Sequence, residues 1–315
     1  MPLMRGRVVV SFTVGAASGF LCYAILTRLH AGAYDFTWAL YPARDLLAGG
    51  NPYTHMPPGA IGYPLTAVLL AVPLAGFSDP VAAGIFFGIS SALLALGLTR
   101  SGYHRLFVFL AYPYWASLLT AQWVPLIMAA AFFPLLLALT TTKPQIGLPV
   151  FLTHLSKRGV LACLTFVGLT FVVMPTWPRY WLAQAVRYEH FFPILIFPGP
   201  LLLVALLRYR ERGAQLLLLT AAMPQRWFYD AFTLWLIPRS RREILYTAVF
   251  SWGTGIWRWY HVPHSFHEAG RWAVIFLYLP MLVVVLVRPR PTEQVDQGEV
   301  AISCAETAGS SLRSE

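Results

Sequence analysis

Charged side chains are scarce in this sequence. Only 11% of its 315 residues are charged, whereas 57% are hydrophobic. A water-soluble domain carries about 25% charged residues, so the composition excludes a soluble enzyme and a disordered chain. Apolar runs that approach the roughly 20 residues of a membrane-spanning helix occupy 8–29, 81–99, 124–142, 160–177, 191–207 and 272–287. The sequence therefore predicts a membrane protein.

Cysteine is also rare, which excludes a scaffold held together by disulfides. Cys22 and Cys163 lie inside apolar runs, and Cys304 lies in a polar tail. None of them is placed where an oxidising compartment would cross-link a loop.

Basic residues outnumber acidic ones, 23 against 13, and only Lys143 and Lys157 among them are lysines. No basic face or basic arm of the kind that holds nucleic acid is present, so we expect no nucleic-acid partner. The basic residues form short clusters between apolar runs, which is typical of cytoplasmic loops under the positive-inside rule. These clusters lie at 5–7, 157–158, 208–212, 239–242 and 288–290.

The order of apolar and polar segments predicts an all-α, polytopic membrane bundle in residues 1–288, followed by a disordered cytoplasmic tail at 289–315. We expect about eleven membrane segments in the plasma (inner) membrane, with the N-terminus inside. Residues 30–64 then form a long first outer loop, in which 36–48 is expected to be an amphipathic helix on the membrane surface. Residues 65–77 and 81–99 are counted as two helices. The same count places Lys143 outside, but also Arg100 and Arg105, against the positive-inside rule.

Acidic residues are concentrated in the predicted outer segments: Asp35, Asp45, Glu189, Asp230 and Glu268. Asp35 directly follows the first predicted span, where a carboxylate can face an aqueous pocket near the lipid headgroups. Its alternative role is a helix N-cap. Asp45 would lie about 15 Å from Asp35 along a helix, too far for paired carboxylates. This arrangement indicates a single general base.

Several short motifs carry a resemblance. They are Asp35-Phe36, Tyr41, Ala43, Leu47, Gly49, Asn51-Pro52-Tyr53, Tyr63-Pro64, Ala121-Gln122, Lys143-Pro144 and Met223-Pro224-Gln225-Arg226-Trp227. Residues 7–289 resemble polyprenyl-phosphate-sugar-dependent glycosyltransferases of the C superfamily, and are most similar to the polyprenol-phosphate-mannose-dependent mannosyltransferases. The resemblance implies that Asp35 is the catalytic aspartate. Two departures stand out: Trp227-Phe228-Tyr229-Asp230 replaces Trp-x-His-His, and Tyr63-Pro64-Leu65 replaces Tyr-Pro-Pro.

The implied reaction moves mannose or another hexose from a polyprenyl phosphate to a lipid or glycan acceptor on the outer face. It needs a base for the acceptor hydroxyl and cations for the departing phosphate. Asp35 is the expected base, and Lys143, Arg226 and Arg187 are the expected phosphate ligands. Further substrate-binding candidates are Tyr53, Trp227, Tyr229, Asp230, Gln145 and Arg44.

Each candidate has a structural alternative. Lys143 is equally typical of a helix end whose charge reaches back to the interface. Trp227 fits an interfacial aromatic belt. Arg44 with Asp45 fits a local charge pair. The segment 187–190 could line the acceptor pocket or form an interfacial ion pair.

A divalent cation is the only cofactor to consider, and no metal ligands are assigned. His261, His264, His267 and Glu268 have suitable side chains, but Pro263 interrupts their helical spacing.

Two other functions stay open, a transporter or lipid flippase and a noncatalytic relative. A transporter is expected to carry ionisable residues at mid-membrane depth, and often an inverted repeat. The centres of the runs 8–26, 81–98, 160–176 and 272–287 contain no such residues, and the sequence shows no repeat.

Overall fold

The computed structural model describes residues 2–29, 34–55 and 62–289, and within these ranges the regular structure is helical. One isolated antiparallel bridge, between Phe191 and Gln225, is the only β-type pairing in the described residues. The predicted all-α class is therefore confirmed. The predicted tail and part of the first outer loop lie outside the described residues.

Most of the helices are short. The α-helices are α1 (Pro2–Arg28), α2 (Tyr34–Leu47), α3 (Leu65–Ala71), α4 (Asp79–Leu98), α5 (Tyr112–Leu119), α6 (Val124–Ala130), α7 (Pro144–Thr153), α8 (Lys157–Val173), α9 (Trp177–Ala185), α10 (Arg212–Ala222), α11 (Arg241–Tyr260), α12 (Phe266–Ala273) and α13 (Leu279–Val287). The 3₁₀ helices are η1 (Val72–Leu74), η2 (Thr99–Ser101), η3 (Tyr103–Leu110), η4 (Pro134–Thr142), η5 (Pro193–Leu195), η6 (Gly199–Arg208) and η7 (Phe228–Leu236), and η8 (Val274–Tyr278) is a π-helix.

Proline sets many of these boundaries. The sequence holds 24 prolines, and a proline stands in the first turn of α5, α6, α7 and α9. Proline is tolerated there because the first turn has no intrahelical acceptor for its missing N–H. The same residue ends a helix that reaches it from the N-terminal side, so proline-rich apolar runs divide into short helices.

Three helices are long and apolar enough to cross a membrane: Met4–Arg28, Asp79–Ser101 and Phe266–Val287. α8 and α9 together would make a fourth crossing, but they are bent by 103° at their junction. A membrane protein is thus supported. The count of about eleven segments is not established, because the remaining described elements are shorter or, in the case of α11 (20 residues), less apolar.

α1 and α4 pack side by side through glycine. A Cβ atom built on Gly19 would lie 2.7 Å from the carbonyl oxygen of Gly84, and one on Gly15 would lie 2.7 Å from that of Gly88. This close backbone approach is typical of small-residue interfaces between membrane helices. The pair is antiparallel, because the Arg7 guanidinium near the start of α1 donates to the Leu96 carbonyl near the end of α4.

The packing of α3 changes the predicted path of the chain. α3 has seven residues, packs on α2 and is followed by the three-residue η1. It is too short to cross a bilayer, which needs about 20 residues. The chain from α2 to the start of α4 therefore stays at one end of the molecule. As a result Arg100 and Arg105 lie at the same end as Arg7, and the conflict with the positive-inside rule disappears.

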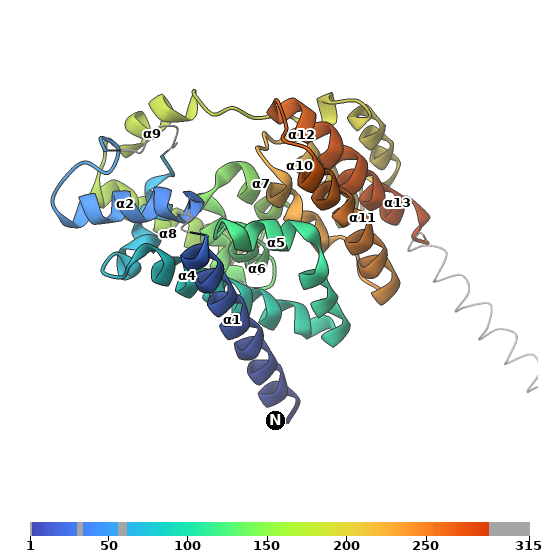
Figure 1. Ribbon diagram of the computed structural model, residues 1–315, viewed down its shortest axis with the longest axis horizontal. Helices are drawn as coiled ribbons and strands as arrows, with labels where there is room; N and C mark the ends of the chain where they lie inside the picture. The colour runs from blue at the N-terminus through green and yellow to red at the C-terminus, as the bar shows by residue number, and fades with distance from the viewer. Residues whose placement is uncertain (1, 30–33, 56–61, 290–315) are drawn as a thin grey trace, which may run out of the picture.

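Successive reversals of the chain gather most basic side chains at this end, which we call the basic end. Figure 1 shows the N-terminus of α1 pointing away from α2 and α9. The basic end carries Arg5, Arg7, Arg100, Arg105, Lys157, Arg158, Arg208, Arg210, Arg212, Arg239, Arg241, Arg242 and Arg288.

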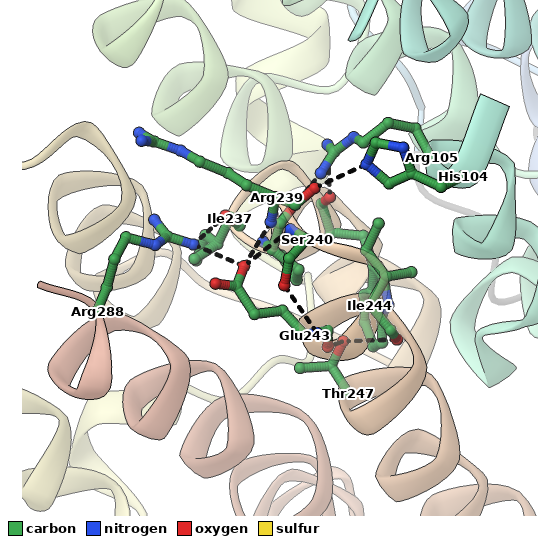
Figure 2. A network of polar contacts seen from close by, with 11 residues as sticks. His104, Arg105, Ile237, Arg239, Ser240, Glu243, Ile244, Thr247 and Arg288 are labelled. Carbon is green, nitrogen blue, oxygen red and sulfur yellow. Dashed lines mark hydrogen bonds and ion pairs between the residues drawn. The ribbon is translucent and has the colours of Figure 1, made fainter. Parts of the chain in front are cut away.

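Polar contacts tie several elements together at the basic end (Figure 2). The Arg105 guanidinium donates to the carbonyl of Pro238 and, at 3.4 Å, to that of Trp235. The Arg288 guanidinium lies 2.9 Å from the Glu243 carboxylate. These contacts join η3, the start of α11 and the end of α13.

The opposite end, which we call the carboxylate end, holds the described acidic residues other than Glu211 and Glu243: Asp35, Asp45, Asp79, Glu189, Asp230 and Glu268. α2 lies there and is fixed by Arg44, whose guanidinium pairs with Asp79 at 2.8 Å and donates to the carbonyls of Ala75 and Phe77.

Candidate functional site

A cavity of about 280 Å³ lies at the carboxylate end. Its wall is assembled from five chain segments: α2, the segment before α3, the start of α7, α9 with the residues after it, and the turn between α10 and η7. The side chains that line it include Asp35, Trp38, Tyr63, Lys143, Gln145, Trp181, Tyr188, His190, Arg226 and Tyr229.

Asp35 is buried in the first turn of α2, with 7% of its surface exposed. The neighbouring Phe36 anchors this turn, because its ring stacks on Phe86 at 4.4 Å. The Tyr63 hydroxyl donates to the Asp35 carboxylate at 3.2 Å, and the Tyr229 side chain interacts with it as well. Asp35 lies within α2 rather than before it, and its carboxylate is shared by tyrosines from two distant segments. This arrangement goes beyond the capping role that the sequence left open.

Burial raises the pKa of the Asp35 carboxyl above its usual value of 3.8. The positive charge of Lys143 acts in the opposite direction, and the negative charge of Asp230 adds to the increase. The hydrogen bonds from Tyr229 and Tyr63 lower the pKa, but burial is the larger effect. A carboxylate with a raised pKa holds a proton more tightly, which is the property that a general base needs.

Lys143, which lines the cavity, forms a buried ion pair with Asp230, which lies behind the cavity wall. The Lys143 ammonium lies 3.0 Å from the Asp230 carboxylate and also donates to the Gln122 side-chain carbonyl at 3.1 Å. Lys143 is 4% exposed and Asp230 is fully buried. The other Asp230 oxygen accepts the backbone N–H groups of Arg226 (2.9 Å) and Trp227 (3.4 Å). Asp230 thus balances the charge of Lys143 and fixes the turn that carries Arg226.

The residue before Gln122 has an unusual backbone conformation. Ala121 has φ of +47°, in the left-handed region that favours glycine. Alanine adopts this conformation at some cost in strain, which glycine would not carry.

Arg226 lies on the cavity wall among aromatic rings. The centre of its guanidinium is 5.2 Å from the ring of Phe266, 5.4 Å from that of Trp38 and 5.8 Å from that of Tyr188. Within the described part of the chain, no carboxylate pairs with this guanidinium. Cation–π contacts orient a guanidinium without neutralising its charge. The cavity therefore contains a positive charge that is available to an anion.

Two further predicted residues lie at the cavity. Gln145, at the start of α7, lines it and hydrogen-bonds to the Tyr188 hydroxyl. The Tyr229 ring lines it too, and its centre lies 5.1 Å from the Lys143 ammonium. From the segment 187–190, Tyr188 and His190 line the cavity, whereas Arg187 and Glu189 are exposed and form no ion pair in the described structure.

Besides Asp230, the structure places four predicted substrate-binding residues away from the cavity wall. Arg44 is occupied by Asp79, and Arg187 is exposed to solvent. Tyr53 lies behind the wall, where its hydroxyl donates to the Tyr63 carbonyl at 3.1 Å. Trp227 turns away from the cavity and packs on Phe228, Phe266 and Arg258.

The histidines considered for a divalent cation do not converge. In the described ranges no group of three His, Cys, Asp or Glu side chains is positioned to hold a metal ion. The His261 ring contacts the Trp257 carbonyl, and the Glu268 carboxylate accepts the backbone N–H of His264. These residues shape the loop before α12.

Trp38, Tyr63 and Trp181 complete the cavity, although none of them was among the predicted site residues. The sequence contained a signal for one of them: Trp38 follows Asp35 by three positions, and residues at this spacing share a helix face. Tyr63 and Trp181 come from distant segments, and no local pattern points from either of them to Asp35.

No protein-family model matches this chain, and no curated protein or solved structure is detectably similar to it. The resemblance to the mannosyltransferases therefore rests on the quoted motifs alone and stays a prediction.

Proposed function

We propose that this protein is an integral-membrane glycosyltransferase that moves a hexose from a polyprenyl phosphate to a hydroxyl of a lipid or glycan acceptor. One observation carries the proposal: a buried carboxylate, Asp35, and a cation without a carboxylate partner, Arg226, line the same cavity. Transfer of a sugar from a phosphate donor needs a base and an anion site, and both groups lie on the wall of this one cavity.

In the proposed reaction the acceptor oxygen attacks the anomeric carbon of the sugar. The bond from that carbon to the phosphate oxygen breaks, and the polyprenyl phosphate leaves with the bonding electron pair. Asp35 takes the proton of the attacking hydroxyl. General-base assistance of this kind contributes about 10² to 10⁴ in rate.

Arg226 is the proposed ligand of the leaving phosphate. Its charge is not balanced by a carboxylate, whereas that of Lys143 is balanced by Asp230. Stabilising the negative charge that develops on a leaving group contributes on the order of 3 kcal/mol for one well-placed donor. Lys143 also lines the cavity, and its charge lowers the pKa of Asp35 and so opposes the effect of burial.

A second cavity suits the lipid part of the donor. It has a volume of about 320 Å³, lies between η4, α7, α8 and α9, and shares Pro64, Pro144 and Trp181 with the first cavity. Its lining is almost entirely apolar. A polar pocket that continues into an apolar one fits a phosphate head attached to a hydrocarbon chain.

The distribution of charge supports a site on the outer face of the plasma (inner) membrane. Cytoplasmic ends of membrane proteins are enriched in Lys and Arg, and the basic end lies opposite the cavity. In this proposal the shorter helices and 3₁₀ segments add further passages through the bilayer to those of the three long helices.

Sugar transfer from purified polyprenyl phosphates tests the proposal. Membranes that contain the protein are incubated with polyprenyl phosphates carrying radiolabelled mannose or glucose, and label in the lipid and glycan fractions is counted. We expect Asp35→Asn to reduce transfer by at least 10²-fold, in line with loss of a general base. Asp45→Asn is the matched control, because Asp45 lies outside the cavity and the one described ion pair of its carboxylate is with His55, at 3.8 Å.

Full transfer by the Asp35→Asn variant would refute the proposed role of this carboxylate. Label that crosses the bilayer of proteoliposomes without being transferred would favour a transporter instead.

A further inference from the structure

Three exposed arginines lie at the start of α11. Arg239 precedes Ser240, which caps the helix, and Arg241 and Arg242 form its first turn. Figure 2 shows the Arg239 side chain extending away from the hydrogen-bonded network that its own backbone joins. Arg241 contacts the Phe107 ring at 5.2 Å. The Arg242 side chain forms no hydrogen bond or ion pair with any described residue.

The acidic residues near this triplet cannot neutralise it. The basic end has thirteen Lys and Arg side chains in the described structure, against two carboxylates. The Glu211 carboxylate pairs with Arg208 at 2.6 Å, and that of Glu243 pairs with Arg288 at 2.9 Å. Among the described residues, no carboxylate is therefore left to pair with the exposed guanidinium groups of the triplet.

An exposed apolar stripe begins directly beside the triplet. Tyr246, Val249 and Phe250 follow Arg242 by four, seven and eight positions, which places them on the same face of α11. Val249 is 70% exposed, Phe250 43% and Tyr246 37%. The stripe continues along α11 to Ile256, which is 58% exposed. A positively charged patch therefore joins an apolar face on one helix.

We propose that the start of α11 binds an anionic phospholipid, with its headgroup on Arg239, Arg241 and Arg242 and an acyl chain along the stripe that begins at Tyr246. The patch alone would accept any phosphate, but the adjoining apolar face selects a phosphate that is attached to a hydrocarbon chain. The leaflet at the basic end supplies the lipid. This proposal is independent of the proposed glycosyltransferase activity.

Native mass spectrometry of the full-length protein tests the proposal. The protein is purified in detergent, mixed with equal amounts of phosphatidylglycerol and phosphatidylcholine, and the bound lipids are counted. Each basic side chain near an anionic membrane surface contributes a preference of about fivefold. We expect the triple variant Arg239→Gln, Arg241→Gln, Arg242→Gln to lower the preference for phosphatidylglycerol by about tenfold or more.

The matched control is the triple variant Arg28→Gln, Arg179→Gln, Arg271→Gln, which removes three exposed arginines from the carboxylate end. It should leave the preference for phosphatidylglycerol within about twofold of the wild type, because the electrostatic effect falls off beyond a Debye length. An equal loss in both variants would overturn the proposal, as would no loss in the first. If the triple variant fails to fold, Arg242→Gln alone should lower the preference by about fivefold. Displacement of the lipid by inorganic phosphate, beyond the effect of sodium chloride at equal ionic strength, would also overturn the assignment to a lipid.

Discussion

Replacing Asp230 with asparagine should destabilise the protein strongly, because it leaves the Lys143 ammonium buried without a counter-charge. The two groups are 3.0 Å apart, and Lys143 is 4% exposed. Removing one partner of a buried ion pair costs about 3 to 5 kcal/mol. Asparagine keeps an oxygen that can accept the backbone N–H groups of Arg226 and Trp227, so the substitution mainly removes charge.

Thermal unfolding in detergent measures the effect. At about 2 to 4 °C per kcal/mol for domains of roughly this size, Asp230→Asn should lower the midpoint by about 6 to 20 °C. The double variant Asp230→Asn, Lys143→Met removes both charges and should recover much of the loss, because a buried pair contributes little net stability over apolar side chains of similar size. Asp45→Asn serves as the control and should shift the midpoint by less than about 2 °C.

A midpoint for Asp230→Asn equal to that of the wild type would refute the reasoning, since the pair could not then be both buried and charged. A double variant less stable than Asp230→Asn would show instead that Lys143 has other essential contacts, such as its hydrogen bond to Gln122.

Three further predictions concern the cavity and the helix packing. Burial raises the pKa of Asp35 above 3.8, and the deprotonated carboxylate is the active form. The kcat/KM for sugar transfer should therefore rise with pH through that raised pKa. A transfer rate that does not change on acidification would contradict Asp35 as the base. Arg226→Gln should reduce the rate of sugar transfer by about 10² to 10³. Arg226→Lys should keep part of the activity, and Arg187→Gln should keep all of it. Equal losses in Arg226→Gln and Arg187→Gln would contradict the special role of Arg226. Gly19→Leu should destabilise the packing of α1 on α4 by about 3 kcal/mol or more, because a side chain at this position meets the Gly84 carbonyl. An unchanged midpoint of thermal unfolding would show that the two backbones do not touch.

Composition predicted the membrane class and the all-α fold, because an apolar chain can satisfy its backbone groups in lipid by forming helices. The same argument located α1, α4 and the final helical span, which are long uninterrupted apolar runs. It also counted 65–77 as a membrane segment, although the helix there is too short to cross a bilayer. A short apolar helix that lies on its neighbours has the same composition as one that begins to cross, so hydropathy alone cannot separate the two.

Asp35, Lys143 and Arg226 were identified from the sequence because charged residues are rare in an apolar chain and therefore conspicuous. Their relationship was not predictable. Lys143 and Asp230 are 87 positions apart, and only the folded chain shows that they neutralise each other. Of the two cations that line the cavity, Arg226 is then the one without a carboxylate partner. Tyr63 likewise reaches Asp35 through a turn whose path no local pattern describes.

The sequence by itself thus determined that this chain is helical, embedded in a membrane, and basic at the segments that join its helices, because hydrophobicity and charge are properties of each residue and act wherever the residue lies. The tertiary structure decided which charges are paired and which remain available. Pairing depends on distances between segments far apart in the chain, and such distances are fixed only when the helices pack.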